Sequence, residues 1–407
     1  MHGNQRAPYL SELIGRIGRT AQSHKQLADL ARLNCCEHPS ELRKPYYQRY
    51  LDFLYMMIRW GELSTRYHAQ QVDLIGRKIR KDYLSYQRFI RDRQNIRTRR
   101  FDYACLLQNK LVFERHFSSA RLPTAPILGI VNTGLSANFP DYSSGAVDFW
   151  TLGKNQLMER RLFCKPQHGI KGAGAFTLQF KNSHALLNGK PVNREQLSSA
   201  MQCAYMVQPV IQQHDLLAQF HPKSLNTIRM ITFNLPEGIE LFLTHLRMGA
   251  EGQINDNNNA SRAIVRVHQD SGRLYDVGYS IQSEHLSLAS AHPTTGIKFA
   301  NQAIPHFNAC CELAIAAHKE IPEMLSIGWD IAITPSGPLL LEGNDDWGAT
   351  TAMWAMPDFR EQFIARTRKG GRNESFANGR RPDSYVAGAV VPLAFPAEFD
   401  NHAASGP

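Results

Sequence analysis

The chain has 407 residues, of which 43% are hydrophobic, so it can bury a large core and should hold two or three structural units. Its seven cysteines show no Cys-x-x-Cys spacing, which argues against structural zinc or disulfides and for a reducing compartment. The N-terminus lacks the apolar run of a signal peptide, and the longest late apolar stretch, residues 385–395, is too short to span a bilayer, so we expect a cytoplasmic protein.

The net charge of +10 is concentrated near the N-terminus. Residues 1–100 hold 20 Lys and Arg against 9 Asp and Glu, whereas the remaining 307 residues hold 26 against 27. Apolar residues recur at helical spacing over residues 8–33 and 46–94, which predicts a basic, α-helical N-terminal region over residues 1–99. Such a region attracts nucleic acid, anionic lipid or an acidic substrate, or it is a solvated helical face. We expect its last arginines to capture an anionic substrate: Arg93, Arg97, Arg99 and Arg100.

Beyond residue 100 the pattern changes to short apolar runs separated by Gly and Pro. Helical stretches are interleaved with these runs at residues 105–119, 194–200 and 303–320. The mixture predicts an α+β core rather than an alternating Rossmann chain, and we divide it into residues 100–204 and 205–368. The last segment, residues 369–407, is rich in Gly, Asn and small residues, and we expect a mobile or loosely docked tail.

Two acidic residues interrupt a strongly apolar hairpin pattern, GWDIAITPSGPLLLEGNDDWG, at residues 328–348. If the hairpin centres on Ser336, Asp330 lies directly opposite Glu342, and Asn344 falls on the same face. Facing carboxylates repel each other unless a divalent cation lies between them, so this set predicts a Mg²⁺ site. The alternative is an edge hairpin with both acids in water, and a register slip of one residue would separate the pair.

A glycine-rich loop follows another apolar strand in RLFCKPQHGIKGAGAFTLQF, residues 161–180. Backbone N–H groups of such a loop can approach phosphate oxygens, while Lys165 adds a positive charge. The loop returns to a strand and matches neither a P-loop nor a dinucleotide fingerprint, so by itself it favours a purely structural role. Lys110 begins a predicted helix upstream, and the strand YMVQPVIQQH offers the backbone of residues 208–210 to an adenine edge.

These motifs, in this order, resemble the ATP-grasp superfamily. The similarity is greatest to its sugar-transfer-associated branch, through FCKPQHGIKGAGAF, SLNTIRMITF, HPTTG and IGWDIAITPSGPLLLEGN, and it covers roughly residues 100–355. The resemblance implies an ATP-grasp fold, in which two α+β subdomains grip ATP. It implies a nucleotide site formed by the following residues: Lys110, Lys165, His168, Gly169, Gly172, Gly174, Gln208, Pro209 and Val210. It also implies that Asp330, Glu342 and Asn344 hold Mg²⁺.

The resemblance further implies an ATP-dependent ligase. Such an enzyme activates a carboxylate as an acyl phosphate and joins it to an amine or hydroxyl of a small metabolite or saccharide. Catalysis is then mainly alignment and charge neutralisation, for which we expect Arg229, Arg247 and Lys165. Either arginine could instead pair with a core acid. The alternatives are a kinase with the same ATP site and a nucleic-acid-binding protein acting through its basic region, although nucleic acid is not an expected partner.

Overall fold

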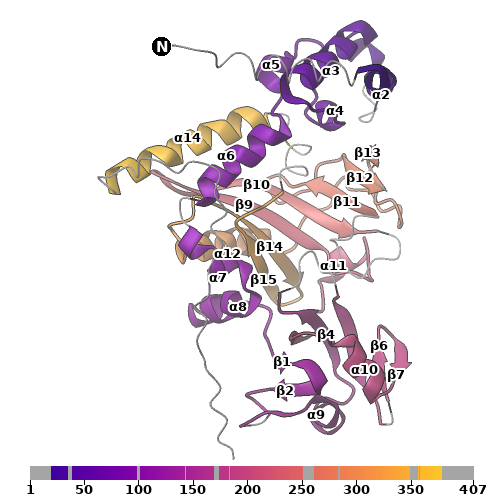
Figure 1. Cartoon of the computed structure of the whole chain (residues 1–407), viewed down its shortest axis with the longest axis vertical. Coiled ribbons are helices and arrows are strands. Elements are labelled where there is room, and N and C mark those ends of the chain that lie inside the picture. Colours follow the sequence, from indigo (N-terminus) through magenta and orange to yellow (C-terminus); the bar gives the residue numbers. More distant parts are fainter. Residues whose placement is uncertain are drawn as a thin grey trace, which may run out of the picture.

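The computed structural model describes residues 20–34, 39–98, 101–142, 144–168, 174–182, 184–250, 261–282, 285–348, 356 and 358–377. A small helical module occupies one end of the molecule, a large sheet lies in the middle, and a smaller strand-rich unit forms the other end (Figure 1). Among the helices in these ranges, none combines the length and the apolar character that a membrane span requires. The cysteines in these ranges are free thiols.

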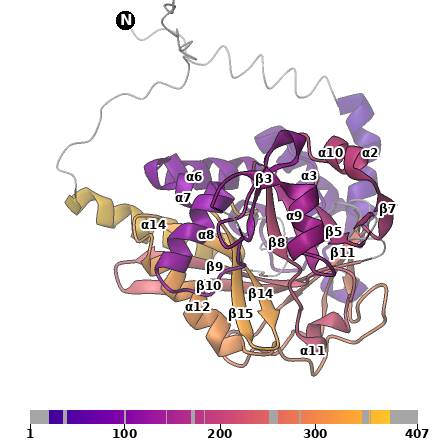
Figure 2. The same cartoon turned by 90° about the horizontal axis from the view of Figure 1, so that it is seen from below.

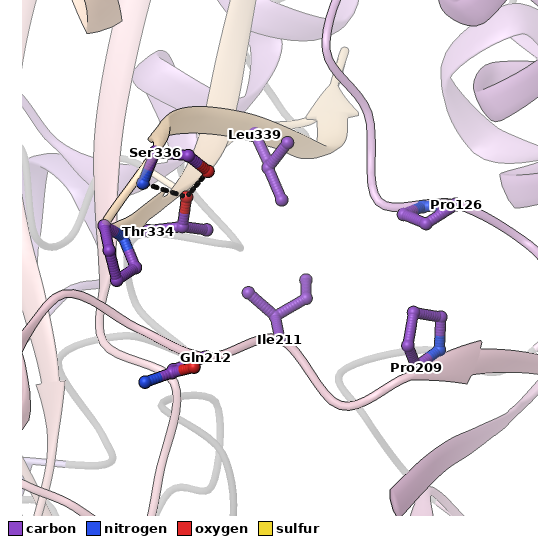
Figure 3. A pocket seen from close by; sticks show the side chains of 8 residues that line it. Pro126, Pro209, Ile211, Gln212, Thr334, Ser336 and Leu339 are labelled. Atoms are coloured by element: carbon purple, nitrogen blue, oxygen red, sulfur yellow. Dashed lines mark hydrogen bonds between the residues drawn. The ribbon is translucent and has the colours of Figure 1, made fainter. Parts of the chain in front are cut away.

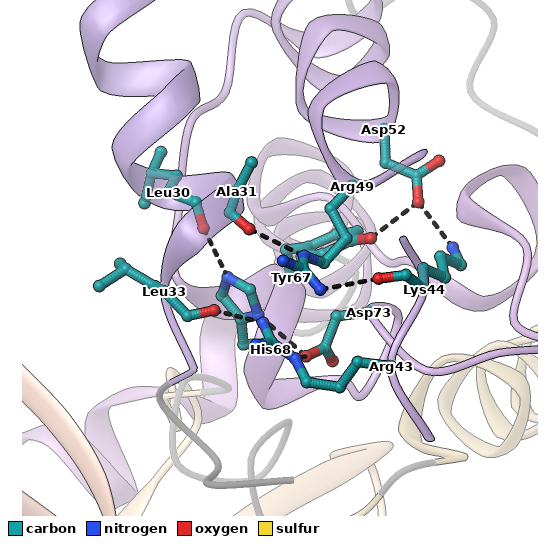
Figure 4. Close-up of polar contacts among 10 residues, drawn as sticks. All are labelled: Leu30, Ala31, Leu33, Arg43, Lys44, Arg49, Asp52, Tyr67, His68 and Asp73. Carbon is teal, nitrogen blue, oxygen red and sulfur yellow. Dashed lines mark hydrogen bonds and ion pairs between the residues drawn. The ribbon is translucent and has the colours of Figure 1, made fainter. Parts of the chain in front are cut away.

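The N-terminal module is helical, as the apolar spacing predicts. Its helices are α2 (Thr20–Arg32), α3 (Tyr46–Trp60), α4 (Arg66–Ala69) and α5 (Ile79–Asp82). They enclose a separate core that includes Leu27, Phe53, Met56 and Tyr67. Three side chains hydrogen-bond carbonyl oxygens at the C-terminal end of α2: His68 at Leu30, Arg49 at Ala31, and Arg43 at Leu33, the residue after the helix (Figure 4). Cations at a helix C-terminus offset its negative dipole end, so this cluster holds α2 on the module.

The next helix, α6 (Tyr86–Thr98), belongs to the central sheet rather than to the N-terminal module. Leu84 and Phe89 are buried in the same core as Phe359 and Phe363 of α14 (Phe359–Ala377). The helical region therefore does not form one unit up to residue 99. The segment from residue 369 was expected to be a tail, but the structure continues α14 as helix to residue 377, and residues 378–407 lie outside the described ranges.

The central sheet has seven antiparallel strands in the order β13-β12-β11-β10-β9-β14-β15. Its strands are β9 (Thr227–Leu235), β10 (Gly238–Gly249), β11 (Ser261–Arg266), β12 (Gly278–Gln282), β13 (His285–Ala289), β14 (Ser326–Thr334) and β15 (Gly337–Asn344). One face packs on α12 (Phe307–Lys319), α7 (Cys105–Gln108) and α8 (Lys110–Ser119), and the opposite face packs on α6 and α14. Figure 2 shows α8 and α12 beside the β14–β15 hairpin.

The smaller sheet has eight strands in the order β3-β2-β1-β8-β4-β5-β6-β7. Its strands are β1 (Gly129–Val131), β2 (Ser136–Asn138), β3 (Val147–Asp148), β4 (Arg161–Pro166), β5 (Phe176–Phe180), β6 (Ala185–Leu187), β7 (Lys190–Val192) and β8 (Tyr205–Pro209). Helices α9 (Phe149–Gln156) and α10 (Arg194–Ala200) contribute side chains to the core of the same unit. Cys164 and Val207 lie in the core of this unit, so alternation directs their neighbours Lys165 and Gln208 to the opposite face.

Candidate active site

The β14–β15 hairpin places the two predicted acids opposite each other. The structure pairs Asp330 with Glu342 and Gly328 with Asn344, as the sequence predicts. The turn, however, is a two-residue turn, because Thr334 pairs with Gly337 and Ile331 with Leu340. A regular ladder from that turn would set Asp330 against Leu341. An extra residue in β15 shifts the register by one at this point, so an irregularity of the strand, not the turn, aligns the acids.

A row of ionisable side chains crosses the central sheet on one face. Each member is directly opposite the next in the strand ladder: Glu342, Asp330, Arg229, His245 and Arg266. Arg247, two residues after His245 on β10, lies on the same face. Asp330 and Arg247 are buried, and the side chain of Arg229 is 11% exposed. A buried, charged row of this kind requires internal partners or a charged ligand.

Asp330 is the acid that the arginines neutralise. Both Arg229 Nε and Arg229 Nη2 donate to its carboxylate, the latter at 2.6 Å from Oδ2, and Arg247 Nη1 donates to Oδ1 at 3.1 Å. Burial alone would raise the pKa of Asp330, but the two guanidinium groups hold it well below its usual range. The structure therefore shows the pairing with an acid that the sequence left open for both arginines, and their catalytic role remains a proposal.

Glu342 is in the opposite electrostatic situation. Burial, the charge of Asp330 and a hydrogen bond between the two carboxyl groups raise the pKa of Glu342 to about 7. Asn344 Nδ2 lies 3.4 Å from Glu342 Oε1 and 3.3 Å from the carbonyl oxygen of Gly328. Glu342 therefore binds a proton more readily than an ordinary glutamate does, although the charges of Arg229 and Lys165 oppose this shift of its pKa.

Two lysines from different parts of the fold lie in the electrostatic field of Glu342. Lys165 extends from β4 of the smaller sheet, and Lys110 begins α8, where the Asn109 side chain caps the helix by accepting from Leu111 N and Val112 N. Burial lowers the pKa of Lys165 to about 8, opposed by Glu342 and assisted by Lys110. Burial also lowers the pKa of Lys110, and Glu342 opposes this shift. The predicted phosphate-binding lysines and a predicted metal ligand are therefore brought together.

The predicted hinge, residues 208–210, lies at the end of β8, where the chain leaves the smaller sheet. Gln208 Nε2 donates to the carbonyl oxygen of Ala125 at 2.8 Å, and Val210 N donates to the carbonyl oxygen of Arg161 at 2.9 Å. The Val210 N–H is therefore used within the protein. Next to this hinge lies an apolar groove of about 350 Å³ (Figure 3). Its lining residues are Pro126, Pro209, Ile211, Gln212, Thr334, Pro335, Ser336 and Leu339.

The glycine-rich loop is described only at its two ends. His168 is exposed before the loop, and Gly169 and Gly172 lie outside the described residues. Gly174 has a φ of 75°, a left-handed conformation that favours glycine, and its carbonyl oxygen accepts a hydrogen bond from Tyr205 Oη at 3.2 Å. The role of the loop in covering phosphates stays a prediction.

The residues around Glu342 fit a hard divalent cation. Within the ranges that the structure describes, no group of three His, Cys, Asp or Glu side chains is arranged to hold a metal. The set here has two carboxylates and one amide, which are oxygen donors of the kind that Mg²⁺ prefers when phosphate oxygens complete its coordination. Burial and the charge of Asp330 raise the pKa of Glu342, and a bound cation would oppose this effect by favouring the ionised carboxylate.

The sequence patterns did not single out every residue of this cluster. His245 is fully enclosed, and burial together with the nearby Arg229 and Arg247 holds its pKa well below the usual range, so it is neutral. Its Nδ1 has no hydrogen-bond partner within the described part of the chain. The alternation in LFLTHLRMG, which puts His245 and Arg247 on one face, is a signal that could have identified it.

The hydrogen bond between Gln108 and Asp345 was not predicted from the sequence either. Gln108 Nε2 donates to Asp345 Oδ2 at 3.0 Å, which joins α7 to the segment just after Asn344. The two residues are more than two hundred positions apart, so no local pattern connects them.

Replacing Lys165 by Ala is expected to weaken ATP binding by about tenfold, because the variant loses a half-buried positive charge that we predict to face the phosphates. Lys110→Ala should act in the same direction. Isothermal titration calorimetry with ATP measures both effects, and Lys181→Ala, a lysine that pairs with Glu159 on the surface of the smaller unit, serves as the control. If both variants bind ATP as the wild type does, the triphosphate lies elsewhere.

Solved structures offer remote likenesses to this fold. An ADP complex of N5-carboxyaminoimidazole ribonucleotide synthetase is 10% identical, with 60% of this chain and 46% of that chain covered and a TM-score of 0.35. D-alanine-D-alanine ligase from Helicobacter pylori is 9% identical, with 66% and 60% covered and a TM-score of 0.38. The ATP complex of the Bacillus anthracis ligase is 10% identical, with 66% and 68% covered and a TM-score of 0.36. The chain thus spans about half to two thirds of the length of these proteins.

A sequence family supplies the stronger comparison. No curated protein matches the chain. The model of the sugar-transfer associated ATP-grasp family matches residues 91–358, which is about two thirds of the chain. This range includes both lysines, the charged row of the central sheet and the hairpin with its acids, and it confirms the α+β, ATP-grasp fold class that the motifs imply. The chain is therefore a member of the sugar-transfer associated ATP-grasp family.

Proposed function

We propose that the protein is an ATP- and Mg²⁺-dependent ligase that joins a carboxylate to an amine or hydroxyl of a small metabolite or saccharide. The observation that carries the proposal is the convergence of Lys110, Lys165 and Glu342 from a helix and from both sheets. Two lysines beside paired acids suit a triphosphate with its metal, because the lysines neutralise phosphate oxygens and the acids hold the cation. The apolar groove at Pro209 and Ile211 is compatible with an aromatic base near the hinge.

In the proposed reaction, the protein mainly aligns and neutralises charged groups. Lys110 and Lys165 hold the phosphates, while Glu342, Asn344 and Asp330 would hold Mg²⁺, whose role is to withdraw charge from phosphate oxygens. A carboxylate oxygen of the substrate attacks the γ-phosphorus, and the bond to the β-phosphate oxygen breaks to release ADP. The nucleophile then attacks the acyl carbon, loses a proton and displaces phosphate. No protein nucleophile is required.

The arginines support an anionic substrate. Arg229 and Arg247 both contact the carboxylate of Asp330, next to the proposed metal site. Guanidinium groups beside that site suit a substrate carboxylate or the transferred phosphoryl group, because their planar fork matches two oxygens at once. We therefore assign both residues to charge stabilisation during acyl-phosphate formation.

An experiment with a metabolite extract tests this function. The protein is incubated with ATP, Mg²⁺ and the extract, and ADP release and new masses are followed. Hydroxylamine is then added to convert an acyl phosphate to a hydroxamate. We expect ADP release together with a hydroxamate and a new amide or ester. A stable phosphoester without hydroxamate would instead identify a kinase, and no metal-dependent ADP release would contradict both activities.

A further inference from the structure

The short segment that follows the metal-binding strand is held from two sides. Asp345 is buried and accepts a hydrogen bond from Gln108 of α7, as described above. Trp347 is buried, and its Nε1 donates to Ser326 Oγ at 3.0 Å, which anchors it to the start of β14. The chain leaving β15 is therefore fixed within three residues of Asn344.

Arg93 of α6 supplies the contact from the other side. Its Nη1 donates to the carbonyl oxygen of Trp347 at 3.0 Å, and its Nη2 forms an ion pair with Asp346. The Arg93 side chain is only 13% exposed and lies over the ring of Phe89, 5.4 Å from the centroid. Phe89 in turn contacts the Trp347 ring edge-on at 5.7 Å. A fork-shaped guanidinium can hold a carboxylate and a carbonyl at once, which fixes both position and direction.

The prediction that Arg93 captures a substrate is wrong, because its guanidinium already has partners within the protein. Its guanidinium is engaged inside the protein, next to the metal-binding strand. The side chain of Arg97 and the residues Arg99 and Arg100 lie outside the described part of the structure. The Arg93 guanidinium is therefore held by the backbone and an acid of the protein.

Trp347 connects the Arg93 contact to the acids. A Cβ built on Gly328 would lie 2.6 Å from Trp347 Cβ, so the tryptophan occupies the space that a side chain at Gly328 would need. Gly328 is directly opposite Asn344 and two residues from Asp330. A shift of Trp347 would therefore move the strand pair that carries Asp330, Glu342 and Asn344.

We propose that Arg93 is a positioning residue for the divalent-cation site, holding residues 345–347 so that Glu342 and Asn344 point to the cation. The inference rests on the proposed function, because that function supplies the cation. It assigns a part in the active site to α6, a helix of the basic N-terminal region. Residues that orient metal ligands typically affect metal affinity by about 10- to 100-fold when they are replaced.

The test measures Mn²⁺ binding to the full-length chain with a non-hydrolysable ATP analogue present, by the electron paramagnetic resonance signal of free Mn²⁺. We expect Arg93→Ala to weaken Mn²⁺ binding by about tenfold, while affinity for the analogue without metal changes less than about twofold. Arg93→Lys keeps the positive charge but cannot contact the carboxylate and the carbonyl oxygen at the same time. We therefore expect it to fold and to lose less Mn²⁺ affinity than Arg93→Ala does.

Arg366→Ala is a matched control. Arg366 of α14 packs on the same face of the sheet, forms an ion pair with Glu240 and lies over the ring of Phe242 at 4.6 Å. Its partner Glu240 is at the far end of β10, away from the acids. We expect this variant to lose thermal stability, as Arg93→Ala does, and to bind Mn²⁺ as the wild type does.

Two results would overturn the inference while leaving the proposed function in place. One is equal Mn²⁺ affinity in the wild type and in both Arg93 variants. The other is the same loss in Arg366→Ala, which would indicate general loosening of the sheet. A wild-type protein that binds no Mn²⁺ with the analogue would instead contradict the proposed function itself.

Discussion

Glu342→Gln is expected to abolish Mg²⁺-dependent ATP turnover, with a loss of roughly a thousandfold in kcat, since a metal ion contributes several kcal/mol of charge stabilisation to phosphoryl transfer. The amide keeps the shape of the side chain and one oxygen donor, but it removes the negative charge that attracts the cation. ADP release at saturating ATP measures the effect. Glu320→Gln, at the exposed end of α12, is the control with the same chemical change.

Glu342→Gln should raise the stability of the protein near neutral pH, although it abolishes turnover. The pKa of Glu342 is about 7 in the folded protein, above its usual value, so the folded state binds this proton more tightly than the unfolded state does. Stability from this group is present at low pH and is lost as the pH rises through about 7. Glutamine cannot ionise, so Glu342→Gln should gain stability over the wild type between pH 6 and 8.

Urea unfolding at pH 5 and pH 8 checks this stability change. Asp330 does not interfere, because its depressed pKa places its titration well below this window. Lost turnover with a stability gain at pH 8 is the expected combination. Normal turnover would contradict the assignment of Glu342 to the metal, whereas lost turnover with lost stability at both pH values would indicate a disturbed fold.

The sequence predicts the hairpin and its acids well because strand alternation has a fixed period of two. Asp330, Glu342 and Asn344 are therefore placed on one face without knowledge of the rest of the chain. The alignment of the pair, however, depends on the irregularity at Leu341, which no turn rule predicts. The helical stretch at 194–200 is confirmed, with Asn193 as its N-cap, whereas the stretch at 105–119 is divided into α7 and α8 because Asn109 caps a new helix.

Contacts between distant segments account for most of what the sequence could not predict. Nothing local indicates that Arg229 pairs with Asp330, a hundred residues away, rather than with a phosphate. The same holds for Arg93 and Trp347, which meet only because α6 packs on the central sheet. Helical spacing over residues 46–94 reveals the helices but not that α6 belongs to a different core from α3.

Arg229→Met is expected to lower the free energy of unfolding at pH 7 by about 3 kcal/mol, because it removes one of the two arginine contacts described for the buried Asp330. Methionine keeps much of the volume of the side chain, so the loss reports the charge contact rather than a cavity. Urea unfolding of the two proteins at pH 7 measures the difference. Arg266→Met, which replaces another arginine of the same row that is half-buried over the Tyr275 ring, should cost less.

A double-mutant cycle shows whether this loss belongs to the contact with Asp330. Asp330→Asn alone should also destabilise the protein, because both arginines lose their shared carboxylate. If one contact underlies both losses, the double variant should lose clearly less stability than the two single losses added together.

The pH dependence of stability provides a second check on the same contact. The low pKa of Asp330 contributes stability that is present above the unfolded pKa and is lost only as the pH falls through the folded value. Without Arg229 the folded pKa rises, so the difference between wild type and Arg229→Met should shrink as the pH falls below about 4. Additive losses with a pH-independent difference would mean that Arg229 stabilises the fold by packing and that Asp330 is neutralised by other groups.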